Sequence, residues 1–139
     1  MSATVLYMSM SLDGFIAGPN ERLDNGLGDG GHRLHEWLLS DAPGATNADV
    51  IAEAMATGAI VAGRGTFEPA GGWGGDHHDG VPIFVVTRSA PSTPEWPLVS
   101  YVPDVAEAMS QAKAAAGDRN VLVHGEGVTR LALAAGPNR

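Results

Sequence analysis

Short runs of apolar and β-branched residues alternate with segments of helical character, and this alternation most constrains the fold. Such a pattern predicts a largely parallel sheet covered by helices. We therefore expect an α/β fold with a mostly parallel central sheet and flanking helices. The expected strands are Thr4 to Met10, Ala59 to Ala62, Pro82 to Thr87, Leu98 to Val102 and Asn120 to His124. The expected helices are His32 to Leu39, a helix capped by Thr46 or Asn47 that ends at Gly58, Asp104 to Ala116, and Val128 to Ala135.

Length and charge limit the class of protein. The 139 residues suit one domain, 1–139, and their content of 44% hydrophobic and 17% charged residues is typical of a folded protein. The net charge of −8, without a basic stripe, argues against nucleic acid as a partner and against an anionic membrane surface. No cysteine is present, so disulfides and thiolate metal sites are excluded. The N-terminal sequence MSATVLYMSM does not resemble a signal peptide, and we expect a cytoplasmic protein.

Unusual residues follow four of the expected strands. In parallel sheets, ligands bind beyond the carboxyl ends of the strands, so four such exits at one edge would form a site. Asp13-Gly14 lies beyond the first strand, and Gly125-Glu126-Gly127 follows the last. Gly63-Arg64-Gly65-Thr66 and Thr87-Arg88 follow two of the others.

Each exit has a functional interpretation and a purely structural one. The segment 63–66 predicts an anion site at a helix N-terminus, or else a tight turn with a threonine cap. Glycines at 125 and 127 would let a ligand lie against the backbone, but glycines after strands are common. Thr87, Arg88 and Ser89 suit a phosphate monoester, or form a solvated loop. Asp13 is an acid–base group, a hydrogen-bond partner for a polar substrate, or part of an Asp-Gly turn.

The sequence DHHDG at 76–80 invites a metal interpretation. Adjacent histidines on a loop rarely point at one ion, and no second pair of ligands stands at helical spacing. We predict no metal site.

Taken together, four segments resemble the dihydrofolate reductase-like superfamily: MSMSLDGFIAGPN, VAGRGTFE, GGWGGDHHDGVPIFVVTR and VLVHGEGVTRLALAAG. The branch that they resemble is the C-terminal reductase domain of bacterial riboflavin biosynthesis proteins. The resemblance runs in order from near residue 4 to residue 136 and implies a mostly parallel sheet that binds NADPH. It implies hydride transfer to a small heterocycle, either a pterin-like compound or, in the riboflavin pathway, 5-amino-6-(5-phosphoribosylamino)uracil.

The resemblance also implies roles for individual residues. Asp13 would face the substrate as the catalytic residue, and Ala17 and Gly18 would lie near the nicotinamide. Phosphates would be held by Gly63, Arg64, Gly65 and Thr66, and the pyrophosphate would be covered by Gly125, Glu126, Gly127 and Val128. The adenosine 2′-phosphate would be faced by Thr87, Arg88 and Ser89.

Members of this superfamily continue with further strands beyond the helix that ends near residue 136. The resemblance therefore implies a chain that is shortened at its C-terminus and lacks the last strands of the sheet. The strand 120–124 is then expected to have a free edge, which favours a homodimer. The alternatives to a reductase are a non-catalytic nucleotide-binding module and an inactive, truncated homologue.

Overall fold

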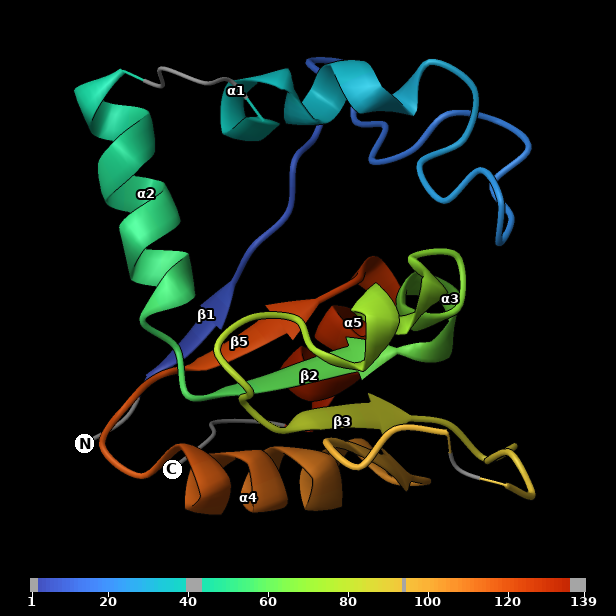
Figure 1. The fold of residues 1–139 in the computed structure, drawn as a ribbon, viewed down its shortest axis with the longest axis vertical. Helices are drawn as coiled ribbons and strands as arrows, with labels where there is room; N and C mark the ends of the chain where they lie inside the picture. Colours follow the sequence, from blue (N-terminus) through green and yellow to red (C-terminus); the bar gives the residue numbers. More distant parts are fainter. Residues whose placement is uncertain (1–2, 40–43, 94, 136–139) are drawn as a thin grey trace.

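A computed structural model describes residues 3–39, 44–93 and 95–135. Its sheet has the strand order β1-β5-β2-β3-β4, and every neighbouring pair is parallel (Figure 1). The α/β fold with a parallel central sheet is therefore confirmed. The strands are β1 (Thr4–Leu6), β2 (Ala59–Gly63), β3 (Ile83–Val86), β4 (Val99–Val102) and β5 (Val121–His124).

Local sequence signals explain where the most regular helix begins and ends. The Asp104 carboxylate accepts a hydrogen bond from the Glu107 N–H at 3.0 Å and caps α4, and Gly117 ends the helix with a positive φ of 62°. The α-helices are α1 (Glu36–Leu39), α2 (Ala45–Met55), α3 (Arg64–Phe67), α4 (Val105–Ala116) and α5 (Glu126–Ala134). Two 3₁₀ segments complete the set, η1 (Gly31–His35) and η2 (Gly71–Gly75).

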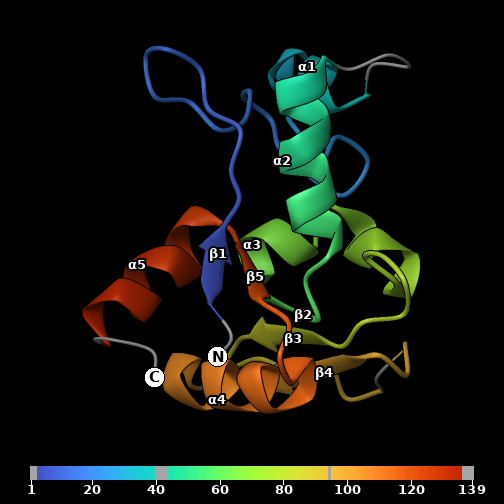
Figure 2. The same ribbon diagram turned by 90° about the vertical axis from the view of Figure 1, so that its left-hand side faces the viewer.

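Both faces of the sheet are buried, as a parallel sheet requires. On one face, helices α4 and α5 contribute Met109 and Val128 to a core with Val61, Phe84 and Val123. The opposite core contains Ile60, Ile83, Val85 and Leu122 of the sheet, and Phe67 and Val81 from the connection between β2 and β3. Figure 2 shows α4 and α5 beside the sheet, with the segment that contains α1 and α2 standing away from it.

Helix α2 is only loosely attached to this core. Among its described side chains only Ala54 is buried, while Val50 and Met55 are 41% and 39% exposed. Its N-cap is Gly44, so the predicted caps at Thr46 and Asn47 are wrong, because both residues lie inside the helix.

Three further expectations are corrected. Strand β1 ends at Leu6, not Met10, because its one neighbour, β5, ends at His124. Strand β5 lies between β1 and β2, so the edges of the sheet are β1 and β4, and β5 has no free edge. Helix α5 begins at Glu126, two residues before the predicted start.

No helix in the described ranges is long and apolar enough to cross a membrane.

Candidate active site

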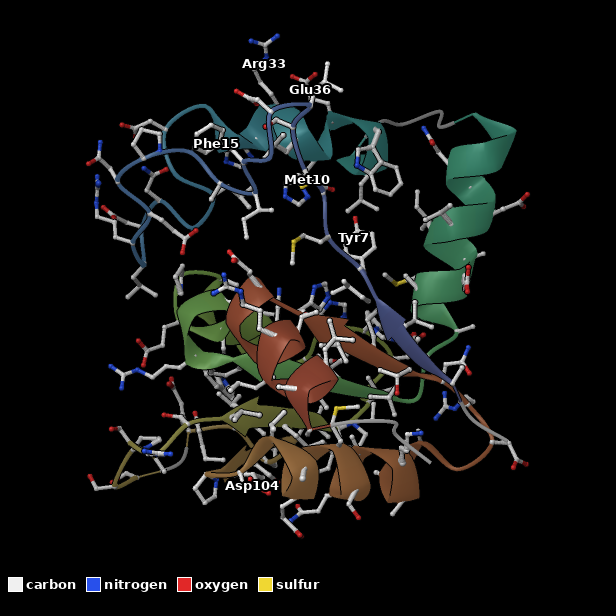
Figure 3. All side chains as sticks on the ribbon, turned by 180° about the vertical axis from the view of Figure 1, so that it is seen from behind. Tyr7, Met10, Phe15, Arg33, Glu36 and Asp104 are labelled. Carbon is white, nitrogen blue, oxygen red and sulfur yellow. The ribbon has the colours of Figure 1, made fainter. Side chains whose placement is uncertain are left out.

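A cavity of about 400 Å³ lies beyond the carboxyl ends of β1, β2 and β5. Segment 16–35, which crosses above this edge of the sheet, supplies the outer wall. Figure 3 shows Tyr7 and Met10 between the sheet and this upper segment, with Arg33 and Glu36 on its far side. The lining includes Tyr7, Ser9, Ala17, Glu21, Leu27, His35, Gly63, Gly65, Thr66, Trp73, His124, Gly125, Glu126, Gly127 and Val128.

A second cavity, of about 860 Å³, lies beyond β2, β3 and β4. It shares Glu21 and Gly65 with the first, so the two cavities adjoin along one edge of the sheet. Its lining includes the aromatic side chains of Phe67, Trp96 and Tyr101. Two adjoining cavities of this kind suit an elongated ligand.

Most of the predicted cofactor residues meet at these two cavities. The first is lined by Ala17, Gly63, Gly65, Thr66, Gly125, Glu126, Gly127 and Val128. The second is lined by Arg64, Gly65, Thr87 and Ser89. Neither lining includes Asp13, Gly18 or Arg88.

Asp13 lies in an exposed turn. Its carboxylate accepts a hydrogen bond from the Ser11 hydroxyl at 2.6 Å, and Ser11 in turn accepts one from the Phe15 N–H at 2.9 Å. Gly14 closes the turn with a φ of 95°. The geometry is that of an Asp-Gly turn, which was the structural alternative for this exit.

Four of the predicted glycines fall into two kinds. A Cβ on Gly18 would lie 2.0 Å from the Asp29 carbonyl oxygen, and one on Gly125 would lie 2.3 Å from Thr66 Oγ1. These two glycines are required by contacts within the chain. A Cβ on Gly65 or Gly127 would meet no heavy atom within 4 Å, and neither residue has a positive φ. Since both line the first cavity, they leave room beside the backbone for a ligand.

The start of α5 is suited to an anion. Its N-cap, Gly125, has no capping side chain, and the first N–H groups of a helix have no intrahelical partner. The Glu126 carboxylate lies 3.4 Å from the Arg130 guanidinium one turn further along, an exposed ion pair that offsets the charge of this carboxylate.

The arginines of the second cavity already have acidic partners. Arg64 Nε lies 2.9 Å from Glu68, and Arg22 Nε lies 2.7 Å from Asp24. Arg88 is exposed on the loop after β3. The Thr87 hydroxyl accepts a hydrogen bond from the Ser89 N–H at 3.1 Å, which shapes this loop as a turn.

Three histidines form a hydrogen-bonded chain that reaches the first cavity at His124, the member of the chain that lines it. His77 Nε2 lies 2.9 Å from His124 Nε2, and His77 Nδ1 lies 2.7 Å from His78 Nδ1. We call these three residues the histidine chain. Each contact uses a different nitrogen of His77, so the rings do not surround a common point. Within the described ranges, no group of three His, Cys, Asp or Glu residues is arranged to hold a metal ion.

Burial sets the protonation of two rings of the histidine chain, His124 and His77. Burial, with a smaller contribution from His77, lowers the pKa of His124 to about 3. Burial, then His78, lowers the pKa of His77 to about 4 against an opposing effect of Asp76. Both rings are therefore neutral at pH 7. Desolvation by burial also lowers the pKa of His35, which lines the same cavity.

The Tyr7 ring packs beside the histidine chain. It packs edge-to-face on His124, with centroids 5.5 Å apart. The hydroxyl is buried and makes no well-aligned hydrogen bond. Burial raises the pKa of Tyr7, and the nearby Ser9 side chain opposes this effect. Ser9 itself accepts a hydrogen bond from Trp37 Nε1 at 3.1 Å.

The motifs of the sequence did not indicate Tyr7, Glu21, His35, Trp73 or His124 as site residues. Tyr7 directly follows β1, and His124 is the last residue of β5. Their position at strand ends was therefore their only signal in the sequence. Trp73 lies in the glycine-rich segment η2, where Trp73 itself has a positive φ of 51°.

Comparisons with known proteins bear on the fold alone. No protein-family model matches the chain, and no curated protein matches it. One similar crystal structure is that of a protein from Shewanella sp. PV-4 that carries the provisional name riboflavin biosynthesis protein. The TM-score is 0.58 at 21% sequence identity, over 91% of this chain and 67% of that one. The chain thus has the α/β fold of that structure.

Proposed function

We propose that this chain is an NADPH-dependent reductase of a small heterocycle, similar to the reductases of riboflavin biosynthesis within the dihydrofolate reductase-like superfamily. One observation carries the proposal: two cavities adjoin at Gly65, and they are lined by most of the residues that the sequence assigned to a cofactor. The provisional name of the structurally similar protein supports the same pathway.

The residues present fit a dinucleotide. Gly65 and Gly127 provide space that a Cβ would fill, and the start of α5 offers backbone N–H groups to a pyrophosphate. Thr87 and Ser89 lie on the wall of the second cavity, where the adenosine end would lie. When bound, NADPH would supply a hydride.

A substrate ring would occupy the rest of the first cavity. There it would meet Tyr7, Glu21, His35 and His124. Asp13, assigned to the substrate side by the resemblance, would reach it only if its turn moved, since it lies outside both linings. This position favours a second candidate, a non-catalytic nucleotide-binding module.

Cofactor binding is tested by titration with NADPH and NADH, followed by nicotinamide fluorescence and by melting temperature. A ligand that binds only the folded state raises the melting temperature. We expect a preference for NADPH. Absence of binding of either cofactor to the folded protein would refute the proposal.

The variant Gly127→Ala makes this test specific. Its new methyl group meets no atom outside its own helix within 4 Å, so the fold should persist, but the group would occupy the space of a bound cofactor. Overpacking of about 1–3 kcal/mol corresponds to a loss of affinity of roughly fivefold to a hundredfold. The matched control is Gly44→Ala, another open glycine, which lies outside both cavities and should retain the wild-type affinity.

Catalysis is tested by oxidation of NADPH in the presence of 5-amino-6-(5-phosphoribosylamino)uracil or of dihydrofolate. A reductase consumes NADPH only when the substrate is added. A binding module would bind NADPH and oxidise none of it with either compound.

A further inference from the structure

The histidine chain connects a backbone carbonyl group to the first cavity. At its inner end, His78 Nε2 lies 3.2 Å from the Thr57 carbonyl oxygen and 3.5 Å from Thr57 Oγ1. Thr57 is fully buried, and its hydroxyl donates to the Ala54 carbonyl at 2.6 Å. Both atoms of Thr57 are therefore acceptors toward His78.

This inner end determines the tautomer of every ring in the chain. A neutral imidazole carries one N–H and one bare nitrogen. In the neutral form of His78, both neighbours of Nε2 are acceptors, so the proton is on Nε2 and Nδ1 is bare. His77 must then donate from Nδ1, which leaves its Nε2 bare. His124 in turn must donate from Nε2 to His77.

The outer end of the chain is the Nδ1 atom of His124. In this tautomer it carries a lone pair and no proton. It has no hydrogen-bond partner in the described part of the chain, and His124 lines the first cavity.

We propose that His124 is a recognition residue that selects a ligand with an N–H or O–H donor. The Thr57 carbonyl, acting through His78 and His77, determines which ring nitrogen of His124 carries the proton. The proposal shares only the cavity with the proposed function, and it does not depend on NADPH. Because the rings of Tyr7, His35 and Trp73 also line this cavity, the ligand class is a flat heterocycle with an amide- or imide-type N–H.

Burial keeps the His124 and His77 rings neutral across the physiological pH range. The pKa values of about 3 for His124 and about 4 for His77 leave both rings neutral above about pH 5. The ionisable groups that act on the two rings are His35, His78 and Asp76. Tyr7 and Trp73 cover His124 with their rings, at 5.5 Å between centroids in each case.

The tautomers can be read directly from the free protein. Long-range ¹H–¹⁵N spectra of ¹⁵N-histidine-labelled protein at pH 7.5 distinguish bare from protonated ring nitrogens. We expect Nε2–H for His124 and His78, and Nδ1–H for His77. An Nδ1–H tautomer of His124, or a charged ring anywhere in the chain, would overturn the proposal.

The variant His78→Ala removes the link to Thr57. His77 and His124 should then become mixtures of tautomers, while the amide spectrum of the sheet stays that of a folded protein. The control is His32→Ala. His32 is exposed and is not part of the histidine chain, so this variant should retain the tautomers of all three rings. Unchanged tautomers of His77 and His124 in His78→Ala would show that Thr57 does not determine which ring nitrogens carry protons.

Ligand selection is tested with uracil, which has two N–H donors, and 1,3-dimethyluracil, which has none. Uracil should shift the His124 Nδ1 resonance and bind at least about tenfold more tightly. In His124→Phe, which keeps a flat ring without an acceptor, this preference should disappear. Equal responses to the two compounds, or no response to either, would refute donor selection. Because NADPH is absent from these samples, failure here is distinct from failure of the cofactor titration.

Discussion

Replacing Gly125 by alanine should destabilise the protein through two separable effects. The backbone at this position has φ 102° and ψ 142°, a region that side chains rarely adopt, and such strain costs about 1–3 kcal/mol. The added Cβ would also lie 2.3 Å from Thr66 Oγ1 and 3.3 Å from Thr66 Cβ. Overpacking of this kind costs about 1–3 kcal/mol more. We expect Gly125→Ala to lower the free energy of unfolding by about 2–6 kcal/mol in total.

A double-mutant cycle separates the two effects. Thr66→Ala removes the Oγ1 atom in contact but leaves the backbone angle unchanged. In that background, Gly125→Ala should cost about 1–3 kcal/mol less, while Thr66→Ala alone should change stability little. Urea unfolding of the four proteins gives the coupling energy. Equal costs of Gly125→Ala in both backgrounds would refute the assignment of this glycine to its contact with Thr66.

Three other variants or conditions test the packing and the charges. Asp104→Ala should lower stability by about 1 kcal/mol, since it removes the cap of α4; urea unfolding measures this, and no change would contradict the capping role. Tyr7→Phe should be neutral or stabilise by up to about 1 kcal/mol, because it removes a buried hydroxyl without a well-aligned partner; a clear drop in melting temperature would show that the hydroxyl is satisfied. The pKa values of His124 and His77 are about 3 and about 4 in the folded state, so the unfolded chain binds more protons between about pH 6.5 and pH 3. Stability should be full above that window and fall by on the order of 2 kcal/mol or more by pH 5. The urea midpoint at pH 7 and pH 5 measures this, and His124→Phe should flatten the dependence.

The fold could be predicted because its signals are local. Apolar runs identified all five strands, and Asp104 and Gly117 identified the ends of α4. Strand order is not local. It places β5 between β1 and β2, and it shortens β1 to the length that β5 can pair. The predicted free edge at 120–124 failed for this reason.

The candidate site shows a different limit. Gly65 and Gly125 are alike in the sequence, since each follows a strand beside a helix start. In the structure, Gly125 is required by Thr66, and Gly65 leaves open space in the cavity. A glycine required by close packing and a glycine that leaves room for a ligand cannot be distinguished in the sequence. The distinction depends on which atoms lie opposite, and those come from segments far away in the chain.

The histidine chain also depends on contacts between segments that are far apart in the sequence. His77 and His124 are 47 residues apart, and their contact forms because the segment after η2 passes over the end of β5. In the sequence, His77 and His78 invited only a metal interpretation. In our proposal, two acceptor atoms of Thr57 determine where each proton lies. Whether His124 accepts a hydrogen bond from a ligand therefore depends on a buried carbonyl group three hydrogen bonds away. The tautomer of His124 in His78→Ala is the measurement that decides whether this long-range effect operates.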